Sequence, residues 1–470
     1  MTPPDQHAGS AIALTAPAAS TVGASMTAGA VGPVLVRLTL PMVGALLATL
    51  GYSVAETWFI ARLGPHALSA VSFTFPVTMV VISLAIGLGA GTSVVVARVL
   101  GAGEAGAGAL VIDAMLLTAT MACLASLAGE LTVYPLFRAL GAPAELLPLI
   151  ASYLRLWFPA AAMFMVAIVG LSAARAAGDA KFQGIAMAGA AALNLIFATP
   201  AILGVAGWPG LGLPGAAVAN ALAWTALLAA TVWRLRSLGL LSGGLPSLAR
   251  LVASSRRILR VGLPAAGTNT IIPISGAIIT AILAGHGTMA VAGFGVAGRI
   301  ESLMMVVFFA LSAVMNPFAG QNAGAQRLDR LRAAMRGTFM FSIGFGAMLA
   351  AVSLWFGPGI AAVFTGDAEV AGVIVDYLMI VPISYGAAGI IAVTNSAFNG
   401  LNRPGAAVVI SVARTVVVNV PLAWLGGMLF GVPGVFLGVC VANLLVGASA
   451  AWWVWCATAP LDAGVRHRHP

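Results

Sequence analysis

Glu56 lies inside a long apolar stretch, where a charged side chain is costly. Tyr52 and Ser53 precede it by four and three residues, so in a helix the three polar side chains share one face. Hydrocarbon disfavours the ionised form of a carboxylate, and a residue that carries a proton needs this property. We therefore predict that Glu56 is a cation-coupling residue. The alternative is a structural carboxylate near the membrane surface, because Glu56 falls late in its apolar run.

Glu301 is the second candidate for cation coupling. It falls near the middle of its apolar run, about 18 Å deep for a helix that rises 1.5 Å per residue. Arg299 is only two residues away and so cannot face Glu301 on one helix, which leaves each needing another partner or a cavity. Neutral polar residues could line that cavity or join helices. The substrate-cavity candidates are Tyr52, Ser53, Asn194, Asn269, Arg299, Asn395 and Asn399.

The composition places these residues in a membrane protein. The chain has 470 residues, of which 61% are hydrophobic and 7% are charged, and its mean hydropathy is +1.05. Soluble domains carry roughly 25% charged residues. The net charge of +9 comes from basic residues scattered between apolar runs, so we expect no nucleic-acid partner. The three cysteines lie in apolar runs and indicate no disulfide or metal site, and no catalytic cluster indicates an enzyme.

The apolar runs predict an all-α polytopic membrane protein with twelve transmembrane helices. A spanning helix needs roughly 20 apolar residues, and neighbouring helices make Gly and Pro tolerable inside it. Met26 is an alternative start to Met1, because everything recognisable follows it. We expect a disordered cytoplasmic tail over 1–33, an N-terminal six-helix lobe over 34–240, a basic interfacial linker over 241–259, a C-terminal six-helix lobe over 260–458 and a cytoplasmic tail over 459–470.

The Lys and Arg residues predict the orientation. With the N-terminus inside, only Arg62, Arg138 and Arg155 fall on the outer side, and Arg299 and Arg414 lie within spans. All the other basic residues are cytoplasmic, as the positive-inside rule requires. We therefore expect a multi-pass protein of a bacterial cytoplasmic membrane with both termini in the cytoplasm.

The chain repeats itself with the same topology. Leu40-Pro41 recurs 223 residues later as Leu263-Pro264, and the same offset relates Gly64 to Gly287 and Gly101-Ala102 to Gly324-Ala325. Further matches continue the series in order. Parallel repeats of this kind are typical of transporters that bind their substrate between two halves, although a duplication alone does not establish transport. The remaining matches pair Ser172-Ala173 with Ser396-Ala397, Asn194 with Asn419, and Gly212–Gly215 with Gly431–Gly434.

These motifs together resemble the multidrug and toxic compound extrusion (MATE) transporters over residues 34–458. The resemblance is carried by an ordered set rather than by one motif, and it implies two six-helix bundles that open alternately to either side of the membrane. It also implies export of organic cations in exchange for protons or sodium ions. The matching segments are Pro41, Ala55–Gly64, Ala67–Val71, Phe75-Pro76, Ala97–Gly103, Arg299–Glu301, Gly320–Ala325 and Arg414 with Pro421.

The sequence departs from the family at two ion sites. Proton-coupled relatives carry an Asp four residues after the Asn that matches Asn194, where this chain has Ala198. Sodium-coupled relatives use acids in helices seven and ten, whereas span seven here has none and span ten has only Asp376 at its outer end. We therefore expect no cofactor and favour protons over sodium as the coupling ion.

The sequence favours a monomeric secondary antiporter that exports amphipathic or cationic organic compounds, with the lipid bilayer and a small-molecule substrate as its partners. The alternative is an exporter or flippase of a lipid-linked or anionic metabolite from the same superfamily. That alternative needs a cationic cavity, which only Arg299 and Arg414 could provide. The substrate itself, the stoichiometry of coupling and the sufficiency of Glu56 alone are left open by the sequence.

Overall fold

The computed structural model describes residues 26–205, 207, 209–242, 244 and 246–458, and helices dominate this part of the chain. Six continuous helices form the first half, the N-lobe. Apolar residues fill their spans, and glycines with positive φ lie at the turns that separate them. The helices are α1 (Val31–Ala61), α2 (Pro65–Ala102), α3 (Ala107–Ala139), α4 (Leu147–Ala176), α5 (Ala180–Leu203) and α6 (Leu213–Ser237).

The second half, the C-lobe, contains the same six spans, but several are interrupted. Span eight bends by 49° between α8 and α9. Span ten is broken by a 3-10 turn, and span eleven contains a π-helical segment. The elements are α7 (Leu248–Ala284), α8 (Thr288–Met304), α9 (Val306–Gly324), α10 (Leu328–Phe364), α11 (Ala368–Ile380), η2 (Val381–Ser384), α12 (Tyr385–Gly400), α13 (Pro404–Val412), η3 (Ala413–Asn419) and α14 (Val420–Ala457).

The predicted number of spans is confirmed once the reversal in α14 is included. Among the described residues, ten helices are long and apolar enough to cross a membrane, or eleven if the bent pair α8 and α9 is one span. Gly431 has non-helical φ and ψ inside α14. A Cβ on Gly434 would overlap the carbonyl oxygen of Gly426, so the chain folds back on itself there and forms spans eleven and twelve.

The internal repeat is reproduced in the backbone. Gly64 (φ 102°) and Gly287 (φ 115°) both precede the second helix of their lobe. Gly212 (φ 64°, ψ −136°) and Gly431 (φ 65°, ψ −146°) share a second unusual conformation before the last helix. Positive φ favours glycine, which has no Cβ to clash with the backbone. The matched glycines in the sequence therefore mark equivalent turns.

Two predicted boundaries differ from the structure. The described part of the N-terminal tail is ordered, because Met26 is fully buried and α1 begins at Val31. The predicted linker over 241–259 is not a separate interfacial helix, since α7 begins at Leu248 and continues into the membrane. Its first turns are bound to the N-lobe by Asp113, whose carboxylate accepts hydrogen bonds from Arg250 at 3.0 Å and from Ser254 at 2.6 Å. The tail over 459–470 and residues 1–25 lie outside the described residues.

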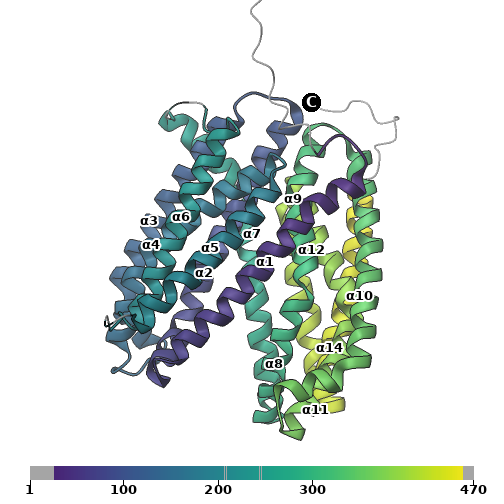
Figure 1. Cartoon of the computed structure of the whole chain (residues 1–470). Helices are drawn as coiled ribbons and strands as arrows, with labels where there is room; N and C mark the ends of the chain where they lie inside the picture. Colours follow the sequence, from purple (N-terminus) through teal and green to yellow (C-terminus); the bar gives the residue numbers. More distant parts are fainter. Residues whose placement is uncertain (1–25, 206, 208, 243, 245, 459–470) are drawn as a thin grey trace, which may run out of the picture.

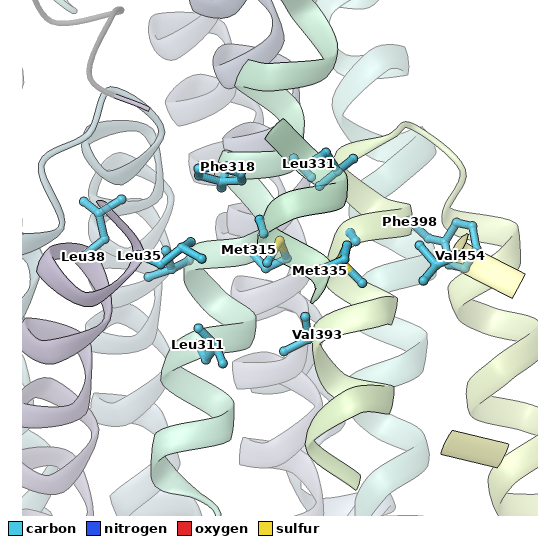
Figure 2. Close-up of a cluster of buried hydrophobic side chains, with 14 of the residues drawn as sticks. Leu35, Leu38, Leu311, Met315, Phe318, Leu331, Met335, Val393, Phe398 and Val454 are labelled. Carbon is cyan, nitrogen blue, oxygen red and sulfur yellow. The ribbon is translucent and has the colours of Figure 1, made fainter. Parts of the chain in front are cut away.

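The two lobes meet at the end of the molecule where the described chain begins at Met26 and ends at Thr458, and they diverge towards the other end (Figure 1). Helix α1 crosses between them. Its first half packs on the C-lobe through Leu35 and Leu38, which belong to the same apolar cluster as Leu311, Met315 and Phe318 of α9 (Figure 2). It also packs on α5 of the N-lobe, where a Cβ on Gly184 would overlap the carbonyl oxygen of Pro41. We call the end that contains Met26 and Thr458 the terminal side.

Backbone contacts close the terminal side. A Cβ on Gly101 of α2 would overlap the carbonyl oxygen of Gln321 in α9, and one on Gly324 of α9 would overlap that of Arg98 in α2. The two glycines are repeat equivalents, so the contact is reciprocal. The Gln321 side chain also donates a hydrogen bond of 2.6 Å to the carbonyl of Ala176 in the N-lobe. Opening this side requires the separation of closely fitted backbones.

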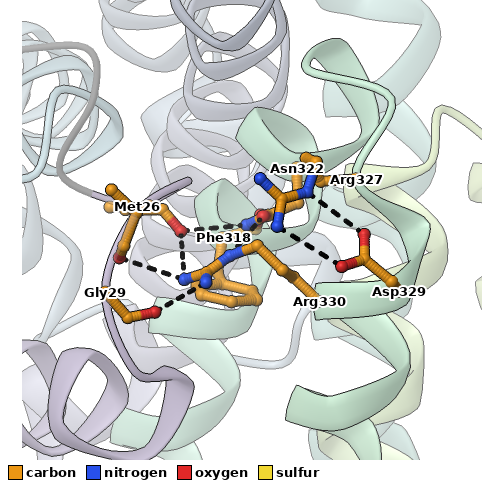
Figure 3. A network of polar contacts seen from close by, with 8 residues as sticks. Met26, Gly29, Phe318, Asn322, Arg327, Asp329 and Arg330 are labelled. Carbon is orange, nitrogen blue, oxygen red and sulfur yellow. Dashed lines mark hydrogen bonds and ion pairs between the residues drawn. The ribbon is translucent and has the colours of Figure 1, made fainter.

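The segment before α1 adds a polar clamp to the same side. Arg330, at the start of α10, donates hydrogen bonds to the carbonyl oxygens of Met26, Ala28 and Gly29, the last at 2.6 Å (Figure 3). Asn322 donates to the Met26 carbonyl at 3.2 Å and accepts from Arg330. The backbone carbonyls of Met26, Ala28 and Gly29 are thereby satisfied by donors of the C-lobe.

We predict that Gly101→Ala destabilises the closed terminal side, because the added Cβ collides with a backbone oxygen that cannot rotate away. Electron paramagnetic resonance distances between labels at Glu104 and Arg327, in a variant lacking the native cysteines, should lengthen. Gly337→Ala is the matched control, since a Cβ there meets nothing within 4 Å. Identical distance distributions in the two variants would contradict the prediction.

Candidate functional site

Asn220 of α6 joins the polar groups around Glu56 into one network in the N-lobe. Its amide nitrogen donates to Glu56 Oε1 at 2.9 Å and to the carbonyl of Ala216 at 3.1 Å. Its amide oxygen accepts from the Tyr52 hydroxyl at 2.8 Å and from the Asn194 amide at 2.9 Å. All four hydrogen-bonding positions of this amide are used, which fixes its orientation.

Three helices position the network. Tyr52 and Glu56 lie one turn apart on the second half of α1, Asn194 lies within α5, and Asn220 lies two turns into α6. Asn194 and Asn220 are each 2% exposed, whereas Tyr52 and Glu56 are half-buried. The carboxylate is therefore held by buried amides but is not sealed off. It lies towards the end where the lobes diverge.

The network contains one unused acceptor. The amide oxygen of Asn194 is buried and has no hydrogen-bond partner among the described residues. Ala198, one turn further along α5, belongs to an apolar cluster and is 1% exposed. Glu56 is therefore the one carboxylate in this network. If it takes up a proton, the carboxyl group gains an O–H that can donate a hydrogen bond, and the amide oxygen of Asn194 is free to accept one. The arrangement can hold or release one proton.

A second polar cluster lies in the C-lobe and contains Glu301. The Tyr377 hydroxyl donates to Glu301 Oε2 at 2.5 Å. The positive charge of Arg414 acts on the same carboxylate. Arg414 Nε donates to Asn443 Oδ1 at 2.9 Å, and Asn443 Nδ2 donates to Ser384 Oγ at 3.0 Å. The sequence had left Glu301 without a partner, and the structure provides one from α11.

The two clusters contain similar residues in the two halves of the repeat. Asn220 and Asn443 are both the last residue of a Val-Ala-Asn sequence, at 218–220 and 441–443, but Asn443 lies one turn further from the matched glycine turn of its lobe. Asn220 donates to Glu56, whereas Asn443 accepts from Arg414. Tyr153 interacts electrostatically with Glu56, and its counterpart Tyr377 binds Glu301. Neither asparagine was among the residues predicted from the sequence. The repeated Val-Ala-Asn, a lone amide among small apolar residues, is the signal that could have found them.

The other predicted cavity residues are not gathered at one place. Arg299 is exposed and forms no hydrogen bond or ion pair with a described residue, and Ser53 is exposed one turn from Thr57. The Asn269 amide donates to the carbonyl of Ala265 on its own helix. Asn395 donates to Ser411 at 3.0 Å, while the amide oxygens of Asn395 and Asn399 are buried without partners. In the described part of the chain, no group of His, Cys, Asp or Glu could hold a metal ion.

Two six-helix lobes, each with a half-buried carboxylate in a polar cluster, are typical of a membrane transporter. The MatE family model matches residues 41–199 and 264–425, one match in each half. The chain therefore belongs to the MatE family, the MATE transporters. This confirms the resemblance in the sequence, the all-helical fold and the multi-pass membrane character.

Individual relatives agree on the family but differ in their names. The chain is 35% identical over 419 residues to a FAD transporter of Shewanella oneidensis, covering 89% of this chain and 93% of the relative. It is 26% identical to the probable multidrug resistance protein YoeA of Bacillus subtilis, covering 83% and 84%. A crystal structure of a mutant of the Vibrio cholerae MATE transporter VcmN superposes with a TM-score of 0.87 at 29% identity, covering 94% and 99%.

We predict that Asn220→Ala lowers the free energy of unfolding by about 1–3 kcal/mol, because it leaves Glu56, Tyr52 and Asn194 without their common partner. Thermal unfolding of the purified protein in detergent measures the effect. Thr225→Ala is the control on the same helix, since Thr225 is exposed and its hydroxyl contacts its own helix backbone and Met163 Sδ, neither of which belongs to the network. Equal unfolding temperatures for the two variants would show that the network does not stabilise the lobe.

Proposed function

We propose that this transporter is a secondary antiporter that exports amphipathic, cationic organic compounds in exchange for protons, with Glu56 as the residue that carries the proton. The observation that carries the proposal is the half-buried carboxylate of Glu56, held by Asn220 and positioned where the lobes diverge. Glu56 forms none of the ion pairs found among the described residues, so no basic side chain neutralises it when it is ionised. Protonation and deprotonation therefore change the net charge of the network.

The distribution of basic residues supports the orientation. Most of the Lys and Arg residues lie on the terminal side, and by the positive-inside rule this favours cytoplasmic termini in a protein of the bacterial cytoplasmic membrane. In this orientation the lobes diverge towards the outside. The proposed transporter acts as a monomer within the bilayer, since each chain contains both lobes.

The network around Glu56 suggests how a proton displaces the substrate. When Glu56 is ionised, its charge attracts an organic cation, and Asn220 donates to one carboxylate oxygen. A proton arriving from outside removes that charge and releases the cation. The protonated carboxyl group can then donate a hydrogen bond, and the unused amide oxygen of Asn194 offers acceptor capacity nearby. Loss of the proton to the cytoplasm restores the binding state.

Protons suit the residues better than sodium. A desolvated Na⁺ needs charged oxygen ligands to offset its lost hydration. The described part of α7 contains no acid within the membrane, and Glu301 is already bound by Tyr377 and lies under the influence of Arg414. One carboxylate that changes its protonation state is sufficient for proton exchange.

We predict that Glu56→Gln abolishes coupled transport without unfolding the protein, because Gln keeps the hydrogen bonds but cannot change its charge. Substrate-dependent proton movement in liposomes, with ethidium as the organic cation, should fall to the level of protein-free vesicles. In the wild type it should persist when choline replaces sodium. Glu130→Gln is the control, since Glu130 is an exposed acid paired with Arg155. Transport by Glu56→Gln at normal rates would exclude the role of Glu56, and loss in choline would exclude protons as the sole ion.

A second candidate function is export of an anionic metabolite. The relative named a FAD transporter, at 35% identity, favours it, and so does the guanidinium of Arg414 within the membrane. In that case liposomes loaded with FAD should lose it faster when they contain the protein, and excess ethidium should not compete. Competition between ethidium and FAD would instead indicate one cavity that accepts both, and no FAD release would exclude this candidate.

A further inference from the structure

The C-lobe departs from regular helix in three spans, and all three departures meet at one polar cluster. Glu301 lies in the last turn of α8, directly before the bend of span eight. Ser384 and Tyr385 lie at the end of the 3-10 turn in span ten. Arg414 lies in the π-helical segment of span eleven. The helices of the N-lobe are continuous, so the repeat does not account for these breaks.

Irregular helices inside a membrane protein have a physical cost, because backbone groups lose their regular hydrogen bonds. They are found where the backbone lines a cavity or a ligand site, and π-helical turns in particular concentrate at functional positions. Hydrogen bonds connect two of the breaks directly, from Arg414 through Asn443 to Ser384. The convergence of the three therefore indicates a site rather than three separate irregularities.

The groups of this cluster that could form further hydrogen bonds are donors. Arg414 donates through Nε to Asn443, and its two terminal amino groups donate to no described residue. The Tyr385 side chain is 0% exposed, and its buried hydroxyl forms no hydrogen bond of good geometry in the described chain, although the Tyr377 hydroxyl lies beside it. A planar guanidinium with both terminal amino groups free is suited to the two oxygens of a carboxylate or phosphate.

Glu301 is the internal anion that could occupy these donors. It bonds to Tyr377, and it interacts electrostatically with Arg414 and Tyr385. These three are the titratable or charged groups that face it from α11, α12 and η3. The described parts of α7, α9 and α14 packed nearby present no charged side chain to it. Glu301 and Arg414 do not form one of the close ion pairs found among the described residues.

We propose that Arg414 and Tyr385 form an oxyanion subsite in the C-lobe, which binds the phosphate or carboxylate group of an organic anion, and that Glu301 competes with this group for Arg414. Ionised Glu301 neutralises the guanidinium and disfavours a second anion. Protonated Glu301 leaves Arg414 with an uncompensated positive charge. Anion binding therefore strengthens as the pH falls and Glu301 takes up its proton.

This subsite deepens the second candidate function, because it names the chemical group by which an anionic substrate would be recognised. It does not depend on Glu56, which lies in the other lobe. Binding to purified protein and coupled transport in liposomes can therefore fail independently. If Glu56→Gln loses transport but retains pH-dependent anion binding, the two sites have separate roles.

The test is equilibrium binding of ADP, as a soluble organic phosphate, to the whole protein in lipid nanodiscs between pH 5.5 and 8. We expect the affinity of the wild type to rise by roughly tenfold towards low pH, which corresponds to about 1.4 kcal/mol. Glu301→Gln should bind as tightly at pH 8 as the wild type does at pH 5.5. Arg414→Gln should lose binding, and Tyr385→Phe should weaken it.

Glu301→Gln should strengthen ADP binding at pH 8, whereas Arg414→Gln and Tyr385→Phe should weaken it. These opposite effects distinguish the proposal from structural damage, because a damaged lobe weakens binding in every case. Arg414→Lys keeps the charge but loses the planar fork, and it should bind more weakly than the wild type. Arg336→Gln is the matched control, since Arg336 is an exposed arginine of α10 in the same lobe that belongs to neither polar cluster, and it should leave binding unchanged. Weaker binding by Glu301→Gln, or unchanged binding by Arg414→Gln, would overturn the proposal.

Competition shows which anion the subsite takes. Inorganic phosphate at the same concentration as ADP should displace it weakly if the site recognises an organic anion, because the rest of that molecule adds contacts. Displacement by inorganic phosphate or chloride at equal strength would mean that the subsite binds free anions, and this outcome would overturn the assignment to an organic substrate.

Discussion

A polar group buried in a membrane must find its hydrogen-bond partner inside the protein, and this constraint organises the interior of both lobes. In each lobe an asparagine in the last helix forms several of the hydrogen bonds that the buried polar groups need. Asn220 uses every position of its amide on Glu56, Tyr52, Asn194 and the helix backbone. Asn443 connects Arg414 to Ser384 in the last span of the C-lobe. The two acids can be kept within the membrane because these amides hold the groups around them.

The two lobes contact each other in a different way, through helices that pack closely at glycine residues. Gly101 and Gly324 contact each other's helices reciprocally, and Gly87 and Gly91 of α2 approach Gly262 and its neighbours in α7 in the same way. Lipid provides no hydrophobic force that favours helix association, so tight packing of small residues provides it. Contacts of this kind fit in one arrangement or are lost together, which suits a joint that closes and opens as a unit.

The sequence predicts the architecture well because the membrane imposes it. Apolar runs of sufficient length have to be helices, and the matched glycines at Gly64 and Gly287 identified turns that the backbone confirms. The site was less predictable. The position of Glu56 on the face of Tyr52 could be read from helical spacing, but its partner Asn220 lies 164 residues away. The partners of Glu301 depend on how spans eight, ten and eleven bend, and no local pattern in the sequence encodes those breaks.

The clamp at Arg330 has a consequence for the order in which the protein is assembled. Arg330 and the Met26 carbonyl to which it donates are 304 residues apart. A ribosome adding roughly 5–20 residues per second needs about 15–60 s to cover that distance, during which the first helix is already made. The leading segment therefore has no C-lobe partner while the N-lobe is inserted. The terminal side becomes closed only after α10 has entered the bilayer, so the earliest residues of this structure are among the last to reach their final contacts.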